Sequence, residues 1–278
     1  MVAKTEFRFN IVMLSLKLIV CCWLIISTPY AFAYDRGEPP ETLDGSVKDY
    51  FIGPESRSLV RAIEGEDLRG IDSAISKGTN VNSSGRDGLT PLWWAIKFHR
   101  KASFQHLLEC GADPNAIIKG HYSILDLASG YKDSDYLRLA LKYKGDPNLP
   151  NGRDRDLPIL TAISFDRQTN LMMLIRAGAN LNGIRNGEPP MDAAVAVGRY
   201  DFVYWMLQAN ENEKTDESLR SLIHVIAIRR VGADDDAYVW RERVLVLLRK
   251  RGFAVKKPES GEGRRTKPLP PDIQLGTP

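Results

Sequence analysis

Four segments of the chain end in nearly the same turn, at almost equal spacing. The turns occupy residues 77–82, 110–115, 144–148 and 177–182. Their glycines are separated by steps of 33, 34 and 33 residues, and their final asparagines by steps of 33, 33 and 34. A unit of this length is one supersecondary element that buries its apolar face only against its neighbours. The spacing therefore predicts a solenoid of stacked repeats.

The segment between the first two turns predicts a helical hairpin. Residues 87–95 read Asp-Gly-Leu-Thr-Pro-Leu-Trp-Trp-Ala. Thr90 is suited to cap a helix, and Pro91 fills its first turn, where a missing N–H costs nothing. Leu92 and Ala95 then face the core, and the small alanine lets paired helices approach closely. A second helix follows, with apolar residues at helical spacing at positions 104, 107 and 108.

The glycine of each turn follows the end of a helix. A left-handed conformation is needed at that point, and glycine adopts it without steric cost. We expect this conformation at Gly78, Gly111, Gly145 and Gly178. The asparagine of each turn then starts the connection into the next unit.

The period, the Gly-Ala-Asp-x-Asn turn and the sequence of residues 87–95 together resemble the ankyrin repeat. Trp93 stands where that family usually has histidine. Later copies of the segment are degraded, at residues 123–128, 158–163 and 189–194. Flanking units with helical apolar spacing lie in residues 58–76 and 219–248. The resemblance implies an all-α fold, an ankyrin-repeat solenoid of about six stacked helix-turn-helix units with short β-turn fingers.

The first 33 residues have the pattern of a signal peptide. Basic residues at positions 4, 8 and 17 surround a weakly apolar start, an uncharged run covers residues 18–26, and Ala31-Phe32-Ala33 offers a cleavage site. The uncharged run is shorter than the roughly 18–20 residues that span a bilayer. We therefore predict cleavage after Ala33 and no stable membrane insertion afterwards. An uncleaved membrane anchor is the alternative.

Removal of residues 1–33 leaves Cys110 as the only cysteine. A monomer then has no internal disulfide and must be stabilised by its core, which favours a bacterial periplasm over a eukaryotic extracellular space. We expect a periplasmic or secreted protein. Its predicted parts are a leader at 34–49, the repeat domain at 50–254, and a disordered, basic and proline-rich tail at 255–278.

The sequence lacks the motifs of common enzymes and metal sites. It has no G-x-x-x-x-G-K-[ST], H-E-x-x-H, G-x-S-x-G or C-x-x-C motif. Its histidines are scattered, at positions 99, 106, 121 and 224. For Cys110 we expect an inert, partly buried thiol, with a reactive thiol as the alternative. We expect no catalytic residues, no cofactor and no metal ion. The net charge of +3 argues against a nucleic-acid partner.

The resemblance also implies a binding surface, because ankyrin proteins bind partner proteins on a concave face made of finger tips and inner helices. The positions that carry over to this face are Arg86, Asp87, Leu89, Lys97, Phe98, Lys119, Tyr122, Tyr131, Asp154, Arg155, Phe165, Arg185, Asn186 and Glu188. Aromatic and arginine side chains are common binding hot spots. The mixed charge suits a protein surface better than a nucleic-acid backbone. Packing of Phe98 and Phe165 between neighbouring repeats is the alternative.

These observations lead to a hypothesis of protein binding in the periplasm. Exported bacterial proteins that resemble this chain are often immunity partners of antibacterial toxins, including secreted lipases. We therefore expect an inhibitor, immunity protein or chaperone of an envelope protein or toxin. One alternative is a non-inhibitory scaffold or accessory factor for a periplasmic stress-defence enzyme. The others are an enzyme with an unrecognised site and a host-directed effector.

Overall fold

In a computed structural model of the chain, the described residues are 50–51, 53–118, 122–151, 157–182, 189–209, 216–229, 231 and 236–255. The predicted signal peptide (1–33) and leader (34–49) lie outside these ranges. The predicted tail lies outside them from residue 256 onward.

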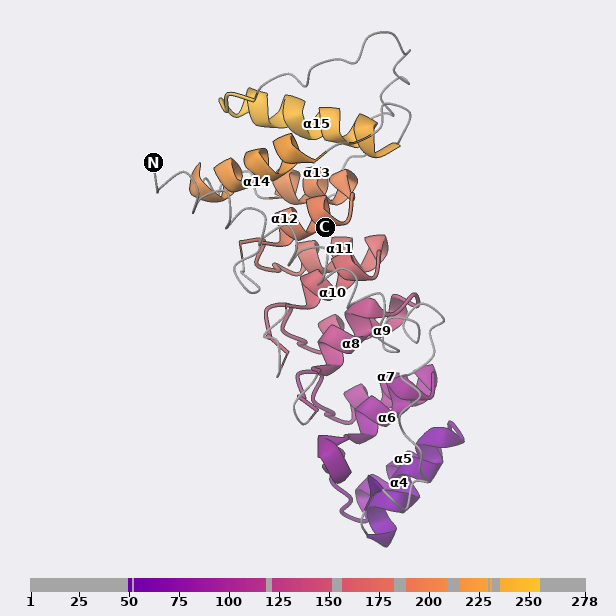
Figure 1. The fold of residues 1–278 in the computed structure, drawn as a ribbon. Helices are drawn as coiled ribbons and strands as arrows, with labels where there is room; N and C mark the ends of the chain where they lie inside the picture. The colour runs from indigo at the N-terminus through magenta and orange to yellow at the C-terminus, as the bar shows by residue number, and fades with distance from the viewer. Residues whose placement is uncertain are drawn as a thin grey trace.

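The described helices follow one another in six pairs, stacked from α4 at one end to α15 at the other (Figure 1). The pairs are α4 (Pro54–Glu64) with α5 (Leu68–Ser76), α6 (Pro91–Lys97) with α7 (Lys101–Glu109), α8 (Ile124–Gly130) with α9 (Asp135–Lys142), α10 (Pro158–Ser164) with α11 (Gln168–Arg176), α12 (Pro190–Ala196) with α13 (Tyr200–Ala209), and α14 (Asp216–Ile228) with α15 (Asp236–Lys250). The described residues contain no β-strand, only a bridge between Ile117 and Ser123. The predicted all-α solenoid is confirmed.

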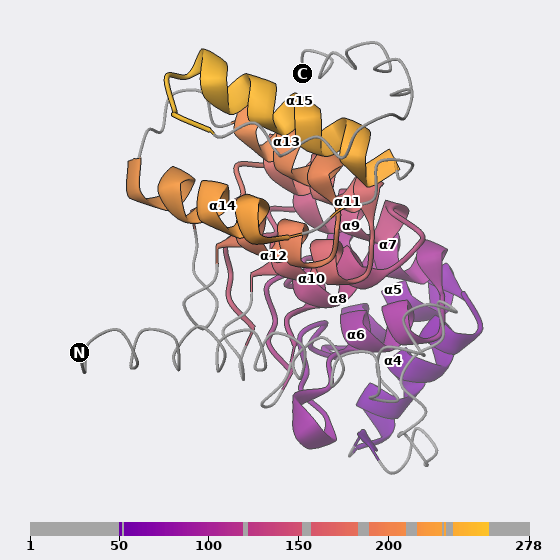
Figure 2. The ribbon, with the colours of Figure 1, turned by 45° about the horizontal axis from the view of Figure 1, so that its top comes forward.

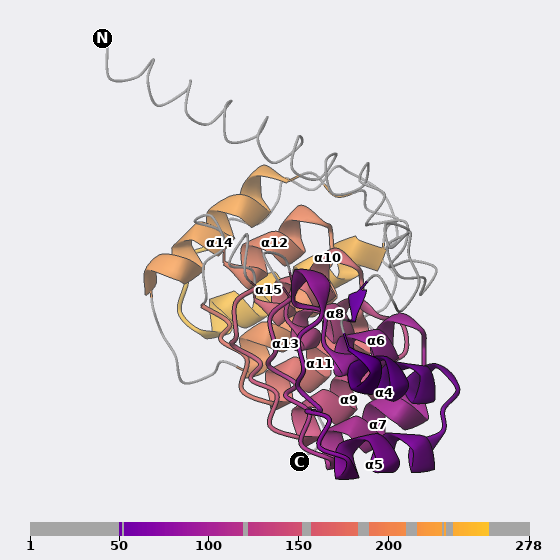
Figure 3. The same ribbon diagram turned by 90° about the horizontal axis from the view of Figure 1, so that it is seen from below.

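The stack has two rows of helices. The first helices of the pairs lie side by side in one row and the second helices in the other (Figure 3). First helix packs on first helix, as α8 does on α10, and second packs on second, as α7 does on α9. Within the described residues, no helix has both the length and the apolar character needed to span a bilayer.

The first helices start where the sequence supplies caps and prolines. The Trp93 amide donates to Thr90 Oγ1 at 3.2 Å, and Pro91 occupies the first turn of α6. Ser123 accepts the Asp126 amide in the same way at 3.0 Å. These caps satisfy amides that have no partner within the helix, so each helix begins at a defined residue.

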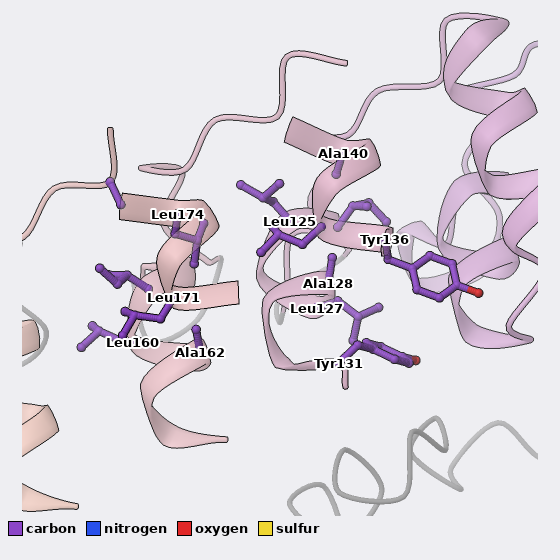
Figure 4. Close-up of a cluster of buried hydrophobic side chains, with 14 of the residues drawn as sticks. Leu125, Leu127, Ala128, Tyr131, Tyr136, Ala140, Leu160, Ala162, Leu171 and Leu174 are labelled. Carbon is purple, nitrogen blue, oxygen red and sulfur yellow. The ribbon is translucent and has the colours of Figure 1, made fainter. Parts of the chain in front are cut away.

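Small side chains allow the first helices to pack closely. Ala95, Ala128, Ala162 and Ala194 occupy matching positions of successive first helices, and each is fully buried. Figure 4 shows Ala128 and Ala162 between the leucines of neighbouring pairs. Burial of such methyl and isobutyl groups against the next repeat supplies most of the stabilisation, since each pair exposes an apolar face when alone.

The last pair is built differently from the others. Helix α15 is long and packs across α13, while α14 packs on α12 (Figure 2). Trp240 of α15 holds this contact, with its ring 5.6 Å from that of Tyr204 and 5.9 Å from that of Trp205. A terminal unit needs one face toward water, which explains its departure from the repeat pattern.

The turns between repeats are joined by a ladder of asparagine side chains. Asn82 donates to the Gly111 carbonyl at 3.0 Å and accepts the Asp113 amide at 2.8 Å. Asn115 and Asn148 make the same pair of bonds to the turns that follow them. The asparagines therefore do more than start a turn, because each one links its own repeat to the next.

One glycine does not have the predicted conformation. Gly78, Gly111 and Gly178 have φ of 92°, 87° and 83°, but in the third turn the left-handed residue is Lys144, with φ 69°. Gly145 sits one position later, where the second and fourth turns have alanine. The prediction for Gly145 was wrong because it followed the glycines, whereas the asparagine spacing carries the true register.

Candidate protein-binding face

Each first helix in the middle of the stack ends in an apolar residue at its C-cap. These residues are Phe98, Tyr131, Phe165 and Val197, which cap α6, α8, α10 and α12. The repeat register places them in a row along one side of the first-helix layer. Phe98 is 36 % exposed and Val197 is 43 % exposed, while Phe165 is half-buried against the core.

Lys97 lies beside this row and is buried. Its side chain is only 6 % exposed, with the ammonium 5.4 Å from the Trp93 ring centroid and 5.7 Å from that of Phe98. Burial lowers the pKa of Lys97 to about 8. The described residues place no carboxylate in an ion pair with it. The two rings are therefore its described electrostatic partners, through cation–π contact. We call Lys97, Phe98, Phe165 and Val197 the first-helix face.

The finger between the first and second pairs is a tight turn. It contains the short helix η1 (Arg86–Gly88), and the Gly85 amide donates to the Leu89 carbonyl at 2.8 Å. Arg86 is exposed, whereas Leu89 packs in the core with 3 % of its side chain exposed. In the next finger Ile117 is 46 % exposed. In the described parts of these two fingers, Arg86 thus adds a charged side chain and Ile117 an apolar one to the surface.

A hollow of about 270 Å³ lies between α14 and α15. Aliphatic side chains line it together with Arg220, His224 and Arg241, and Arg241 donates to the Ile226 carbonyl at 3.3 Å. The described lining residues carry no carboxylate, hydroxyl or thiol, so among them there is no pair of groups for acid–base or nucleophilic catalysis.

Comparison with known proteins agrees with this architecture. The ankyrin repeat family matches residues 87–119, the second pair and the finger before it. The chain is an ankyrin-repeat protein. Protein PhlB of Serratia liquefaciens is 30 % identical over 54 % of this chain and 66 % of PhlB. The putative palmitoyltransferase ZDHHC13 of Danio rerio is 28 % identical over 54 % of this chain and 25 % of its own length. The human DNA-binding protein RFXANK is 42 % identical over 24 % of this chain and 26 % of its own length.

The ankyrin-repeat chain spans just under two thirds of PhlB and about a quarter of each of the other two proteins. The family match places an ankyrin repeat in residues 87–119 of this chain. The match therefore supports a module for binding other proteins, which is the general use of this repeat. A match to a quarter of a palmitoyltransferase does not transfer that activity to this chain.

The structure divides the residues that were predicted to face a partner. Lys97 and Phe98 lie at the end of α6, and Phe165 lies at the end of α10 two repeats later. Arg86 and Asp87 lie in η1, and Tyr122 is half-buried beside the second finger. Those outside the described residues are Lys119, Asp154, Arg155, Arg185, Asn186 and Glu188.

Two predicted residues are core residues in this ankyrin-repeat protein. Leu89 and Tyr131 are each 3 % exposed. The Tyr131 ring packs against His99 at 5.7 Å and Tyr136 at 5.9 Å. Both are therefore removed from the proposed surface, because their side chains pack inside the core. Lys97 is also buried but stays in it, because its ammonium lies 5.7 Å from the ring of the exposed Phe98. The consensus finger leaves Leu89 unspecified. Tyr131 differs from Phe98, Phe165 and Val197 in having an extended backbone at the end of α8, with φ −71° and ψ 148°.

Two surface residues were missed by the sequence reasoning. Val197 occupies the same C-cap position as Phe98 and Phe165, and Ile117 is an exposed apolar residue in a finger. The spacing of 33 from Phe98 to Tyr131 and 34 from Tyr131 to Phe165 pointed to residue 197 or its neighbours. The degraded fourth copy of the repeat hid that signal.

Proposed function

We propose that this ankyrin-repeat protein holds another protein on its first-helix face, which acts as the concave face of the solenoid. The observation that carries the proposal is Lys97, a buried ammonium with no carboxylate paired to it among the described residues. Burying an unpaired charge destabilises the free protein. A partner carboxylate seated over Phe98 would supply the missing counter-charge and the aromatic contact at one point, as binding hot spots do.

The chemistry of the face indicates the chemistry of the partner. Phe98 and Val197 expose apolar surface at two points of the row, and Arg86 adds a positive charge in the finger. A complementary partner surface has an apolar patch and at least one acidic side chain. Truncating a hot-spot contact of this kind costs about 2 kcal/mol or more of binding free energy.

We further propose that the protein acts in the periplasm as an inhibitor, immunity protein or chaperone of an envelope protein or toxin. The signal-peptide pattern of residues 1–33 supports export, and the absence of enzyme motifs in the sequence favours a binding role. Similarity to a protein of the bacterium Serratia liquefaciens is in keeping with a bacterial source.

The export proposal predicts the first residue of the mature chain. Protein recovered from the envelope fraction should begin at Tyr34, because the A-x-A site ends at Ala33. Intact-mass measurement of that protein checks the cleavage. A mass that still includes residues 1–33 would support the membrane anchor instead.

Substitution of Val197 by Asp should weaken partner capture strongly, because it places a carboxylate in the apolar row facing an acidic partner. Bait lacking residues 1–33 is incubated with an envelope extract, and the bound protein is quantified by mass spectrometry. The unsubstituted bait should recover one stoichiometric protein, and Val197→Asp at least about tenfold less, equal to a loss of about 1.4 kcal/mol.

Val246→Asp is the matched control. Val246 is also 43 % exposed, but it lies on the terminal helix α15, away from the row. Both variants add one carboxylate at an exposed valine, so only the position differs. Equal losses in the two variants, or no stoichiometric partner for the unsubstituted bait, would contradict the proposal. Assaying the captured protein with and without the chain then separates an inhibitor from a non-inhibitory scaffold.

A further inference from the structure

A compact group of metal-ligating atoms joins the first two helix pairs on the second-helix side. Asp72 comes from α5, His106 from α7, and Cys110 is the C-cap of α7. Asp72 Oδ1 lies 2.7 Å from His106 Nε2, and Cys110 Sγ lies 3.9 Å from the same nitrogen. All three ligand atoms lie within 4.8 Å of one another. One carboxylate, one imidazole and one thiol therefore converge on a single point.

The imidazole is oriented from its other side. His106 Nδ1 lies 3.5 Å from Glu109 Oε2. Glu109 is held in turn by Gln105, whose side-chain amide donates to it at 2.8 Å, and by the Tyr143 hydroxyl at 3.4 Å. A carboxylate on Nδ1 fixes the tautomer that leaves the Nε2 lone pair free for a metal, and histidine ligands of metal sites usually have such a partner.

We propose that Asp72, His106 and Cys110 form a zinc site that clamps the first pair to the second. Zinc takes carboxylate oxygen, imidazole nitrogen and thiolate sulfur, and three protein ligands leave a fourth position for water or a partner's side chain. Ligands about 2.0–2.3 Å from a tetrahedral zinc stand about 3.3–3.7 Å apart. Rotation of the exposed Asp72 side chain would lengthen the 2.7 Å Oδ1–Nε2 separation to this range, and a small shift of Cys110 must shorten the 3.9 Å Sγ–Nε2 separation. The soft thiolate favours zinc over magnesium or calcium.

Without a metal ion, the surroundings of Cys110 determine whether its thiol is protonated. Burial raises the pKa of the Cys110 thiol, and the negative charges of Asp72 and Glu109 raise it further. The free thiol is therefore protonated and a poor nucleophile at neutral pH, as expected for an inert cysteine. Zinc binding displaces the thiol proton and any proton on Nε2, and both protons pass to solvent. No oxidant or reductant takes part.

Cobalt(II) is the probe, because its absorption reports both thiolate coordination and tetrahedral geometry. The full chain carries Cys21→Ser and Cys22→Ser, so that Cys110 is its only thiol. Titration should show a sulfur-to-cobalt charge-transfer band and tetrahedral d–d bands that saturate at one ion per chain. Zinc added afterwards should remove these bands with a dissociation constant in the micromolar range or tighter. Zinc should also raise the midpoint temperature of unfolding, because it binds only the folded clamp.

Single substitutions test two of the three ligands. Cys110→Ser should abolish the charge-transfer band, and Asp72→Asn should weaken cobalt binding at least about tenfold. His224→Ala, at an exposed histidine of α14, is the control and should bind like the parent. Far-UV circular dichroism confirms that each variant is folded. If Cys110→Ser does not fold, the exposed Asp72 still provides the test. A parent without the charge-transfer band, or a band that survives Cys110→Ser, would overturn the site.

Discussion

Gly145→Ala should lower the free energy of unfolding by about 2–3 kcal/mol, since the added methyl group has no room. A Cβ at this position would lie 2.7 Å from Leu125 Cδ1 and 2.9 Å from the Ala140 carbonyl oxygen. Backbone and a buried leucine both resist moving, so the first and second helices of the third repeat must separate. Urea unfolding followed by circular dichroism measures the change.

Lys144→Gly is the companion variant, and it should raise the free energy of unfolding instead of lowering it. Lys144 holds a left-handed conformation that costs a residue with a Cβ about 1 kcal/mol. Its carbonyl accepts from the Asn115 side chain, a bond that glycine keeps. We therefore expect Lys144→Gly to raise the free energy of unfolding by up to about 1 kcal/mol. If Lys144→Gly destabilised the protein while Gly145→Ala did not, the turn would follow the glycine register after all.

Lys97→Met should stabilise the free protein by about 1–2 kcal/mol at pH 7 and weaken partner capture. The charge is buried in the folded chain and solvated in the unfolded one, which is why the pKa of Lys97 falls from 10.5 to about 8. Methionine fills similar apolar space without the charge. The loss of cation–π contact with Trp93 and Phe98 reduces the gain.

The effect of Lys97 on stability depends on pH in a defined direction. Between the folded pKa of about 8 and the unfolded value of 10.5, the folded chain binds fewer protons at Lys97 than the unfolded chain does. The unfolding free energy of the unsubstituted protein therefore rises with pH in this window, relative to that of Lys97→Met. The difference in unfolding free energy between the two proteins should be largest below pH 8 and should vanish above pH 10.5.

Lys142→Met provides the control for both readouts. Lys142 is exposed on α9, where its ammonium lies 5.2 Å from the Tyr143 ring centroid. The same substitution there should change stability by less than about 0.5 kcal/mol and leave partner capture intact. Partner capture that Lys97→Met leaves unchanged would remove Lys97 as the anchor of the proposed face. A gain in stability combined with a loss of binding is the pattern of a residue retained for function.

The candidate face could be predicted only in part, because a repeat pattern specifies positions rather than exposure. Phe98 and Phe165 were found from the consensus, and Val197 follows from the same register once the C-caps are aligned. Leu89 and Tyr131 occupy positions that the family resemblance assigned to the binding face, yet the packing of their neighbours covers both. The zinc cluster was invisible in the sequence, because Asp72 and His106 are 34 residues apart and match no metal motif.

The sequence by itself determined the repeat, its period and its helices, because caps, prolines, glycines and apolar spacing act over a few residues at a time. Thr90, Pro91 and the alanine at position 95 needed no knowledge of the rest of the chain. Contacts between repeats decided the remainder. The asparagine ladder, the left-handed Lys144, the buried charge of Lys97 and the convergence of Asp72 with His106 and Cys110 exist only when repeats are stacked. Stacking brings together residues about one repeat apart, and this distance lies beyond the reach of local preference.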